Sequence, residues 1–528
     1  MNAGQHPSPK EIRTLIAASS MGTAFEWYDF YIYATLAPLF GKLFFPGSSP
    51  ASGFLLALAT FGVGFAVRPL GAALFGAFGD RFGRKYTFLA TILLMGFATM
   101  AIGLLGTFEQ IGIAAPILLV LLRVLQGLAV GGEYGGATIY VAEHAPPEKR
   151  GFYTGFIQLG ASTGFMLSLL AVLSTSTIMG EEAWLAWGWR VPFFLSLVLL
   201  AISVWMRLKL SESPVFLAMK EAGEIARNPL KEAFSSMPRV KRLLAVMFGI
   251  AAGQAICGYV GLIQVLNFLQ VSQHLDPNLT RFVMIIALTI GAALSMLCGW
   301  LSDKVGRKRL VLLGYGLFLL LVFPVFHMLA AQANPALAKA SRDKPVVVTG
   351  ADCHFNPFAQ SGQSSACARL LDTLTKKGVP YARVDGAAAA APSLTIGGYA
   401  ANAADAEGLA AQLEAAGYST DPVKPATRAL LLIGLGIVLL NLFGALTYGP
   451  VGAWMVELFP ARTRYSSLAI SYNFGVGYFA GFMPFIVQYI VATTGNPFAG
   501  FWYPVAMVVI AATIALFGLP ETAGKPLE

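Results

Sequence analysis

The sequence contains few charged residues. Charged side chains make up 12% of the 528 residues and hydrophobic ones 56%, and the mean hydropathy is +0.67. A soluble domain carries about 25% charged residues. The composition therefore excludes an ordinary soluble protein and indicates a membrane protein.

Motifs for nucleotide-driven or hydrolytic chemistry are also missing from the sequence. No G-x-x-x-x-G-K-[ST] phosphate loop is present, so ATP is not expected to drive the protein. A nucleophile elbow, a zinc-protease motif and a dinucleotide fingerprint followed by a suitable acid are absent as well. The sequence predicts no enzyme, no cofactor and no metal site, which leaves a secondary carrier.

Long apolar runs are what the chain has instead. About 20 helical residues cross a hydrocarbon core of ~30 Å. The first run holds Glu26 and Asp29 in its middle and is too long for the apolar region of a signal peptide, so we expect a retained helix. Twelve runs are long enough, at roughly 14–40, 52–78, 86–107, 112–142, 151–175, 188–209, 242–270, 281–301, 309–331, 428–458, 465–491 and 498–519.

The net charge of +9 follows from topology. The short loops on one side of the membrane carry only Lys42 and Arg281, whereas those on the other side carry most of the positive charge. The positive-inside rule therefore places both termini in the cytoplasm, and the charge indicates no nucleic-acid partner. Alternate short loops and the two tails carry Lys10, Arg13, Arg81, Arg84, Lys85, Lys149, Arg150, Arg207, Lys209, Lys220, Arg227, Lys231, Arg239, Lys241, Arg242, Lys304, Arg307, Lys308, Arg309, Arg462, Arg464 and Lys525.

One loop occurs twice and divides the chain into two halves. GAFGDRFGRK at 76–85 and GWLSDKVGRK at 299–308 both read G-x-x-x-D-[RK]-x-G-R-K. Asp80 and Asp303 end helices, where the macrodipole disfavours an anion, and a helix N-terminus from the other half would be a good partner. We expect a conformational latch between the halves, formed by Gly76, Asp80, Arg81, Gly83, Arg84, Asp303, Gly306 and Arg307. The alternative is an ordinary positive-inside turn in which the acid sets the register.

The first half carries charges inside its apolar runs. Glu26, Asp29 and Tyr33 fall on one helix face. A carboxylate in hydrocarbon costs several kcal/mol, so these acids must face a polar cavity or find partners. They are candidates for substrate or proton handling, and a structural salt bridge between helices is the alternative.

Arg68 is the expected partner of these acids. It lies twelve residues before Asp80, which at ~1.5 Å per residue is ~18 Å from the cytoplasmic end and near the bilayer midplane. An arginine there either pairs with Glu26 or Asp29 or clamps an anionic substrate. Arg123 and Glu133 lie in the fourth run, where Glu133 is either a site residue or a packed structural acid.

The second half has polar groups but no buried carboxylate. Its candidate site residues are Gln254, Tyr259, Asn441 and Asn473. Gln264, Asn267, Thr447, Tyr448 and Tyr472 are further polar residues of these runs. Ion coupling is therefore expected in the first half.

A second repeat sizes an insertion. Glu143, Pro146 and Arg150 match Glu457, Pro460 and Arg464 at the same spacings, but the distance from the doubled loop is 91 residues longer in the second half. The insertion falls in residues 332–427, the long stretch without an apolar run, which lies on the outer side after helix 9. Strand-like 345–348, helix-like 366–378, a short VPYARV and helix-like 406–418 predict a small α/β module of two strand–helix units.

These divisions give five parts: a six-helix bundle at 1–209, a basic cytoplasmic loop at 210–241, helices 7–9 at 242–331, the insert at 332–427, and helices 10–12 at 428–528. Cys353 and Cys367 fall in the insert, and an outer location predicts a disulfide between them. A metal site of these cysteines with His354 is the alternative. Cys257 and Cys298 lie in helices.

Several motifs together resemble a known family. The doubled loop, the R-x-x-Q-G of Arg123, and the strings EWYDFYIY, GGEYGGATIYVAEHAPPEKRGF, WGWRVPFF and ELFPARTRYSS resemble the major facilitator superfamily, and within it the metabolite:proton symporters for α-ketoglutarate, citrate, shikimate and proline or betaine. The resemblance implies two pseudo-symmetric six-helix bundles, alternating access and proton symport. The insert, and an end at Glu528 without the coiled coil of osmosensing betaine carriers, depart from the pattern.

We therefore expect proton-coupled uptake of a small organic acid, a mono-, di- or tricarboxylate, across the bacterial inner membrane. The alternatives are a proline or betaine carrier and a non-transporting receptor whose insert binds the ligand. The expected partners are the solute, a proton and the lipid bilayer, and the protein is expected to be a monomer.

Overall fold

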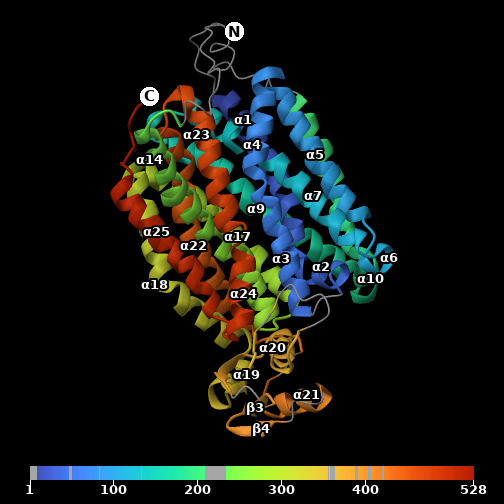
Figure 1. Ribbon diagram of the computed structural model, residues 1–528. Helices are drawn as coiled ribbons and strands as arrows, with labels where there is room; N and C mark the ends of the chain where they lie inside the picture. The colour runs from blue at the N-terminus through green and yellow to red at the C-terminus, as the bar shows by residue number, and fades with distance from the viewer. Residues whose placement is uncertain are drawn as a thin grey trace.

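The computed structural model describes residues 9–46, 50–82, 84–131, 134–208, 234–354, 356, 363–386, 391–401, 406–418 and 421–527. Long helices run side by side along one axis, and a small unit with strands lies at one end of this bundle (Figure 1). The start of α1 and the end of α25 lie toward the opposite end. The end with the strands is called the insert end below.

The first half is helical throughout the part that the structure describes. Pro69 is the second residue of α4 and has no amide hydrogen to donate to the last turn of α3. This missing hydrogen bond explains the break between α3 and α4 at Val67. Its elements are α1 (Pro9–Thr35), α2 (Ala37–Phe44), α3 (Pro50–Ala66), α4 (Arg68–Phe82), α5 (Arg84–Leu104), α6 (Phe108–Ile111), α7 (Ala114–Gly131), α8 (Tyr134–His144), η1 (Pro147–Lys149), α9 (Arg150–Met179), α10 (Glu181–Ala186), η2 (Gly188–Arg190) and α11 (Val191–Leu208).

The second half differs by its π-helical turns, η3 to η6, a feature that is frequent at functional sites. The expected central loop is 210–241, and its residues up to 233 lie outside the described part of the chain. The elements are α14 (Met237–Val246), η3 (Met247–Ala252), α15 (Gly253–Tyr259), η4 (Val260–Gln264), α16 (Val265–Asn267), η5 (Phe268–Ser272), α17 (Pro277–Val305), α18 (Arg307–Ala333), α22 (Thr427–Glu457), α23 (Ala461–Phe474), η6 (Gly475–Ala480), α24 (Met483–Thr494), η7 (Ala499–Phe501) and α25 (Trp502–Gly518).

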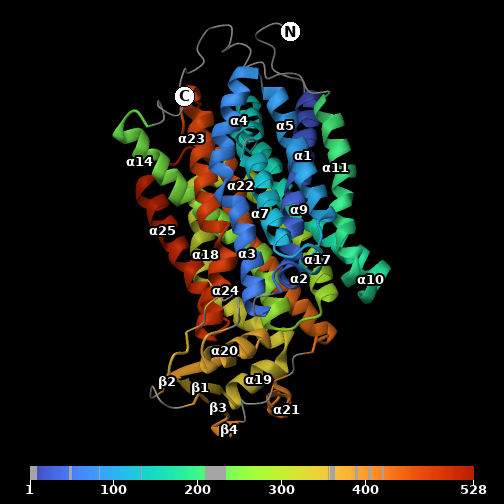
Figure 2. The ribbon, with the colours of Figure 1, turned by 45° about the vertical axis from the view of Figure 1, so that its right-hand side comes forward.

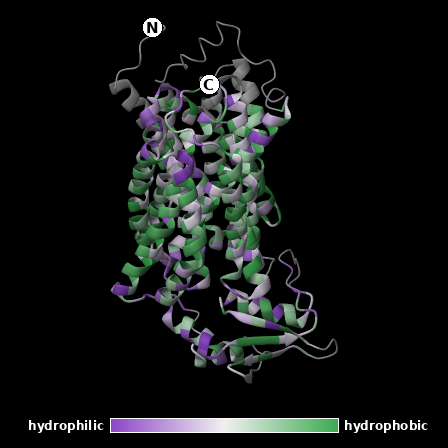
Figure 3. Cartoon of the chain, turned by 90° about the vertical axis from the view of Figure 1, so that its left-hand side faces the viewer, coloured by the Kyte–Doolittle hydropathy of each residue, from purple (hydrophilic) through white to green (hydrophobic). Residues whose placement is uncertain are grey.

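Ten helices of the described residues are long and apolar enough to cross a membrane. The charged α1 and the shorter apolar helix Leu89–Leu104 are not among them, although α1 and α5 run alongside the others (Figure 2). Apolar residues colour the long bundle, whereas its ends and the insert are more polar (Figure 3). The fold is thus a membrane-spanning helical bundle, and the count of twelve spans stays a prediction.

The insert is a small α/β unit with its own core. It comprises α19 (Pro335–Asp343), β1 (Val346–Gly350), α20 (Ala366–Lys376), β2 (Tyr381–Asp385), β3 (Ser393–Ile396), β4 (Tyr399–Ala401) and α21 (Ala406–Ala415). The sheet order is β2-β1-β3-β4, with β1 and β2 parallel and the other pairs antiparallel. The two expected strand–helix units are present, whereas the β3–β4 hairpin, turned by Gly397 and Gly398 at positive φ, was not expected.

A disulfide joins Cys353 and Cys367 across the connection from β1 to α20. Among the described residues, no group of three or more His, Cys, Asp or Glu side chains could hold a metal ion. The disulfide is therefore the pairing that the structure contains, and Cys257 and Cys298 are free and buried.

Glycines set how closely the helices of the first half approach one another. A Cβ atom on Gly127 of α7 would collide with the carbonyl of Gly64, and one on Gly131 would collide with the carbonyl of Arg68. Side chains larger than hydrogen would thus push α7 away from α3 and α4. This close crossing fixes where the α3–α4 break, and with it Arg68, lies in the bundle.

Candidate functional site

Arg68 is a fully buried cation whose guanidinium has no hydrogen-bond partner among the described residues. Its exposed fraction is 0%, and none of its three guanidinium nitrogens finds a hydrogen-bond partner in the described structure. The guanidinium carbon lies 5.0 Å from the Trp27 ring centre and 4.9 Å from that of Phe65. Stacking on aromatic faces compensates part of the lost hydration and leaves the N–H edge of the guanidinium available.

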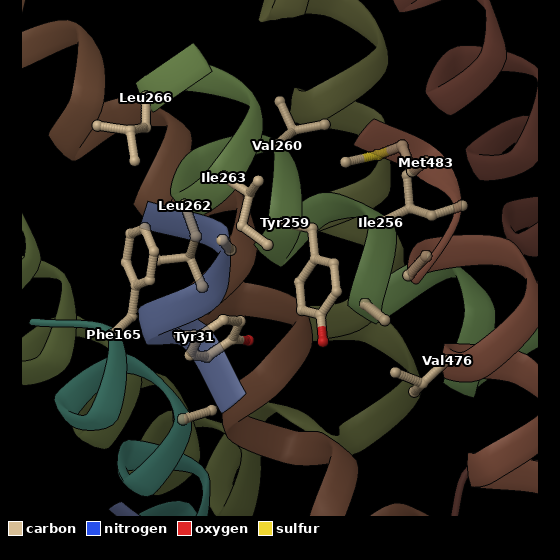
Figure 4. Close-up of a cluster of buried hydrophobic side chains, with 14 of the residues drawn as sticks. Tyr31, Phe165, Ile256, Tyr259, Val260, Leu262, Ile263, Leu266, Val476 and Met483 are labelled. Carbon is tan, nitrogen blue, oxygen red and sulfur yellow. The ribbon is translucent and has the colours of Figure 1, made fainter. Parts of the chain in front are cut away.

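Two tyrosines from opposite halves lie beside this cation. The rings of Tyr31 from α1 and Tyr259 from α15 are 6.1 Å apart, and Tyr259 also lies 5.8 Å from Phe65. Figure 4 shows the two hydroxyls directed toward the same space. Both hydroxyl oxygens are buried without a hydrogen-bond partner within the described residues, and both lie within electrostatic reach of Arg68.

Arg68, Trp27, Tyr31, Phe65 and Tyr259 form what we call the Arg68 site. It contains one cation, four aromatic rings and two hydroxyls at the junction of the two halves. Buried polar groups are normally hydrogen-bonded, so several unsatisfied ones together need an explanation. A solute that supplies the missing acceptors is the direct one.

The acids of α1 do not complete this site. Asp29 is 6% exposed, its Oδ1 is buried without a partner, and the described residues contain no ion pair between it and Arg68. Glu26 is half-buried and does not hydrogen-bond to Arg68 either. The hydroxyl of Tyr33 donates to the Ala57 carbonyl at 2.9 Å. Of the two roles expected for Arg68, pairing with these acids is not seen in this conformation.

Arg123, in contrast to Arg68, is hydrogen-bonded to the helices around it. Its Nη1 donates to Oε1 of Gln126 at 2.7 Å, and its two terminal nitrogens lie 3.4 Å from the carbonyls of Phe30 and Phe61. The ring centres of Phe30 and Tyr33 lie 4.1 and 4.7 Å from its guanidinium carbon. Arg123 therefore holds α1, α3 and α7 together. Glu133 lies outside the described residues.

The amides of the second half face different neighbours. Gln254 donates to the Ala251 carbonyl at 3.2 Å, and its Oε1 is buried without a partner among the described residues. Asn441 donates within its own helix and lies 3.4 Å from the Gly261 carbonyl. Asn473 donates to the Gly131 carbonyl of the first half at 3.2 Å. Of the predicted residues of this half, Tyr259 lies within electrostatic reach of the Arg68 side chain.

Asp303 makes the cross-half contact expected of the doubled loop. Its two carboxylate oxygens accept from the backbone N–H groups of Gly151 and Phe152, at 2.8 and 2.9 Å. These donors open α9 of the first half, and a helix N-terminus favours an anion. Arg307, four residues after Asp303, pairs with the same carboxylate at 2.7 Å. Gly306 has a φ of 110°, and a Cβ there would meet Glu521.

Two further ion pairs cross between the halves at the same end. Each half contributes the arginine of one pair and the acid of the other. Arg150 of the first half pairs with Glu457 of the second at 2.9 Å, and Arg464 pairs with Glu143 at 2.8 Å. Arg307 also reaches Glu457 at 3.3 Å. We call Asp303, Arg307 and these two pairs the latch.

Sequence reasoning used the Glu143–Arg150 and Glu457–Arg464 spacings only as a measure of length. The signal for their pairing was present, because both copies hold an acid and an arginine seven residues apart. It also missed Glu521, whose carboxylate accepts from the N–H groups of Arg307 and Lys308 at the start of α18. Gly83 of the first-half loop lies outside the described residues, and for Gly76, Asp80, Arg81 and Arg84 only the helical backbone is described.

Comparisons with known proteins agree with this architecture. The sequence profile described as "Sugar (and other) transporter" matches residues 14–241 and 415–528. The "Glycine betaine/proline/ectoine/pipecolic acid transporter OusA" of Dickeya dadantii is 31% identical over 98% of this chain and 85% of its own. The "Shikimate transporter" of Escherichia coli is 39% identical over 61% of this chain and 73% of its own.

Among solved structures, the chain is similar to XylE of E. coli, a proton:xylose symporter. The TM-score is 0.63 at 18% identity, with 98% of each chain covered, and a likeness at this identity concerns the fold alone. The profile match, the 31% identical relative and this fold agree with the resemblance found in the sequence. The chain belongs to the Sugar (and other) transporter family of the major facilitator superfamily, whose members are transporters and not enzymes.

Proposed function

We propose that the protein is a proton-coupled symporter for a zwitterionic solute of the proline and betaine class. The observation that carries the proposal is Arg68, a buried cation beside aromatic rings whose three guanidinium nitrogens have no partner in the part of the chain that the structure describes. A carboxylate would accept two parallel hydrogen bonds from the guanidinium. Burying an unpaired charge is expensive, so the arginine is best explained by a ligand that neutralises it.

The aromatic rings favour a zwitterion over a simple anion. Trp27 stacks on Tyr31 at 5.0 Å, and Tyr31 lies edge-on to Tyr259, so aromatic rings and two hydroxyls lie around Arg68. A quaternary or secondary ammonium is attracted by aromatic faces, whereas a second carboxylate is not. Arg123, the other buried arginine nearby, already donates to Gln126. A dicarboxylate or tricarboxylate would therefore leave a carboxylate without a cation.

The names of the relatives support the same choice. OusA is named for glycine betaine, proline, ectoine and pipecolic acid, all of which join a carboxylate to a nitrogen cation. This favours the osmolyte alternative over the organic acid that we expected first. A monocarboxylic acid remains the second candidate, because a relative named as a shikimate transporter is 39% identical.

Asp29 is the proposed proton carrier. A buried carboxyl group whose Oδ1 lacks a partner is more stable neutral than ionised, and it lies on α1, the helix that supplies Trp27 and Tyr31 to the Arg68 site. Protonation and deprotonation there change the charge inside the first half. That change would alter how α1 packs and so couple proton movement to the solute.

The latch is the proposed gate on the cytoplasmic side. Positive-inside asymmetry supports a cytoplasmic position for both termini and the latch, and a periplasmic one for the insert, in the bacterial inner membrane. The contacts between Asp303 and α9, and between Arg150 and Glu457, must break before the halves can separate at this end. With the latch on that side, the proposed gate is closed in this conformation. We expect the carrier to act as a monomer.

Uptake into liposomes tests the proposal. The purified full-length protein is reconstituted, and accumulation of labelled glycine betaine, proline, shikimate and citrate is followed with and without an inward proton gradient. We expect gradient-driven accumulation of betaine or proline and little of citrate. Accumulation of shikimate alone would replace the zwitterion by the second candidate. Uptake that ignores the gradient would contradict proton coupling.

A further inference from the structure

A cavity lies between the insert and the bundle, and none of the Arg68 site residues lines it. Its volume is about 250 Å³, just below the roughly 300–1,000 Å³ of drug-sized ligand pockets. Lys42 of α2 and Leu55 of α3 line it from the first half, and Gln488 of α24 lines it from the second. Thr375 and Tyr381 close it from the insert. The size suits a small metabolite.

Hydrogen bonds attach the insert to the second half around this cavity. Tyr381 donates its N–H to the Gly495 carbonyl at 3.1 Å and its hydroxyl to the Ala492 carbonyl at 2.7 Å. The Nε2 atom of His274, just after η5, lies 2.8 Å from the Lys377 carbonyl. From the first half, α3 packs against α20 (Figure 2). The cavity wall is therefore completed only when both halves and the insert are together.

The lining combines one cation with neutral polar side chains. Lys42 is exposed and cationic, Gln488 is a buried amide at 8% exposure, and Thr375 and Ser272 supply hydroxyls. Among the described lining residues none is acidic, and the remainder is mostly apolar, as in Leu55. A positive charge with amide and hydroxyl donors fits a carboxylate, and the apolar wall fits methyl groups or a small ring.

We propose that this cavity is an outer solute site, in which Lys42 and Gln488 hold the carboxylate of the transported zwitterion before it reaches Arg68. The inference rests on the proposed function for the class of solute. Lys42 belongs to the first half and Gln488 to the second, so opening of the insert end would separate them and release the solute toward Arg68. The insert thereby forms the outer wall of a capture site.

Betaine binding to the full-length protein in nanodiscs tests the outer site. Equilibrium dialysis with labelled glycine betaine should give two bound molecules per chain. Lys42→Gln should reduce this to one and raise the KM for uptake about three- to fivefold, the size of a screened surface charge pair, with Vmax unchanged and the effect smaller in high salt. Lys339→Gln removes an equally exposed charge from the insert, outside the cavity lining, and should leave both numbers unchanged.

A space-filling variant checks the cavity by another route. Thr375→Tyr places a ring in it, whereas Thr373→Tyr adds the same ring on the same helix outside the lining. Only the first should lose the second bound molecule, with the Cys353–Cys367 disulfide intact in both as a control for folding.

The outcomes separate the two proposals. One betaine per chain that is lost in Arg68→Gln, together with an unchanged KM in Lys42→Gln, would overturn the outer site and leave the proposed function standing. If neither betaine nor proline binds or is transported, the proposed function falls, and the outer site for this solute falls with it.

Discussion

The two halves of the bundle differ at their centres and resemble each other at one end. Near the middle, the first half buries Arg68, Arg123 and Asp29, at exposures of 6% or less. The second half offers Gln254 and Tyr259 there. At the latch end, both halves instead contribute an acid and an arginine with the same spacing. Solute and proton chemistry is thus proposed for the centre, where the halves differ. The halves contact each other at the latch end, where they are alike.

The difference has a physical reason. A gate that closes two related bundles works best when each presents what the other needs, and the exchanged pairs Arg150–Glu457 and Arg464–Glu143 do so. A solute site for one carboxylate needs one cation, and a second would leave an unpaired charge in a low-dielectric interior. The comparison therefore predicts that charge changes in the first half affect solute and proton, whereas those at the latch affect conformation.

The largest expected effect comes from Arg68. Arg68→Gln removes the charge that would pair with the solute carboxylate, a loss of about 2–5 kcal/mol for a buried pair, so kcat/KM for betaine uptake should fall at least about 30-fold. Gln254→Leu, a change at the centre of the second half, should cost less than about tenfold. Initial rates in liposomes measure both. Equal losses in the two variants would contradict the proposed functional difference between the two halves.

Asp29→Asn should separate transport from proton coupling. With the membrane potential clamped at zero, one pH unit drives about tenfold accumulation for a single coupled proton, because 1.4 kcal/mol corresponds to a factor of ten. The variant should lose this accumulation and keep exchange of labelled for unlabelled betaine. If it still concentrates betaine, Asp29 is not the coupling carboxyl. Thr60→Val, which removes a hydroxyl bonded within α3, serves as a control.

The latch should respond according to how deeply each pair is buried. The Glu457 and Arg150 side chains are 1% and 3% exposed, whereas Glu143 is 19% exposed. Glu457→Gln should favour the inward-open conformation by about 1 kcal/mol, or about fivefold, and Glu143→Gln should do so less because its pair is better solvated. Distances between spin labels at the latch ends of α9 and α17 report the shift. A larger effect of Glu143→Gln would contradict the burial argument.

The smallest expected effect concerns the junction of the insert. Burial lowers the pKa of His274, partly offset by its hydrogen bond to the Lys377 carbonyl. Because the folded pKa lies below the unfolded value of about 6.5, protonation is unfavourable in the folded junction, and its stability falls as the pH drops below about 6.5. Amide exchange of α20 should rise modestly over this range, and His274→Gln should flatten the dependence. An unchanged pH profile in that variant would assign the effect elsewhere.

Much of the architecture could be predicted from local patterns. The doubled loop indicated two halves, and the Glu-Pro-Arg spacing placed the insert at 332–427, whose strands and helices the structure contains between α18 and α22. The β3–β4 hairpin was not predicted, although SLTIGGYA alternates around Gly-Gly as a hairpin does; its strands are only four and three residues long and follow a low-complexity alanine run. The substrate class was also predicted less well, since an arginine in an apolar run suits many anions.

The sequence by itself determined the membrane setting, the two halves, the position of the insert and the residues able to carry charge, because composition and repeats are local properties. Only the tertiary structure decided which of these charges meet. Arg123 donates to Gln126 and lies near two carbonyls, whereas the guanidinium nitrogens of Arg68, near Tyr259 of the other half, have no partner among the described residues. Arg150 pairs with Glu457, which is 307 residues away in the sequence. Such choices depend on which helix faces pack together, and the spacing of residues within one helix holds no information about the face opposite.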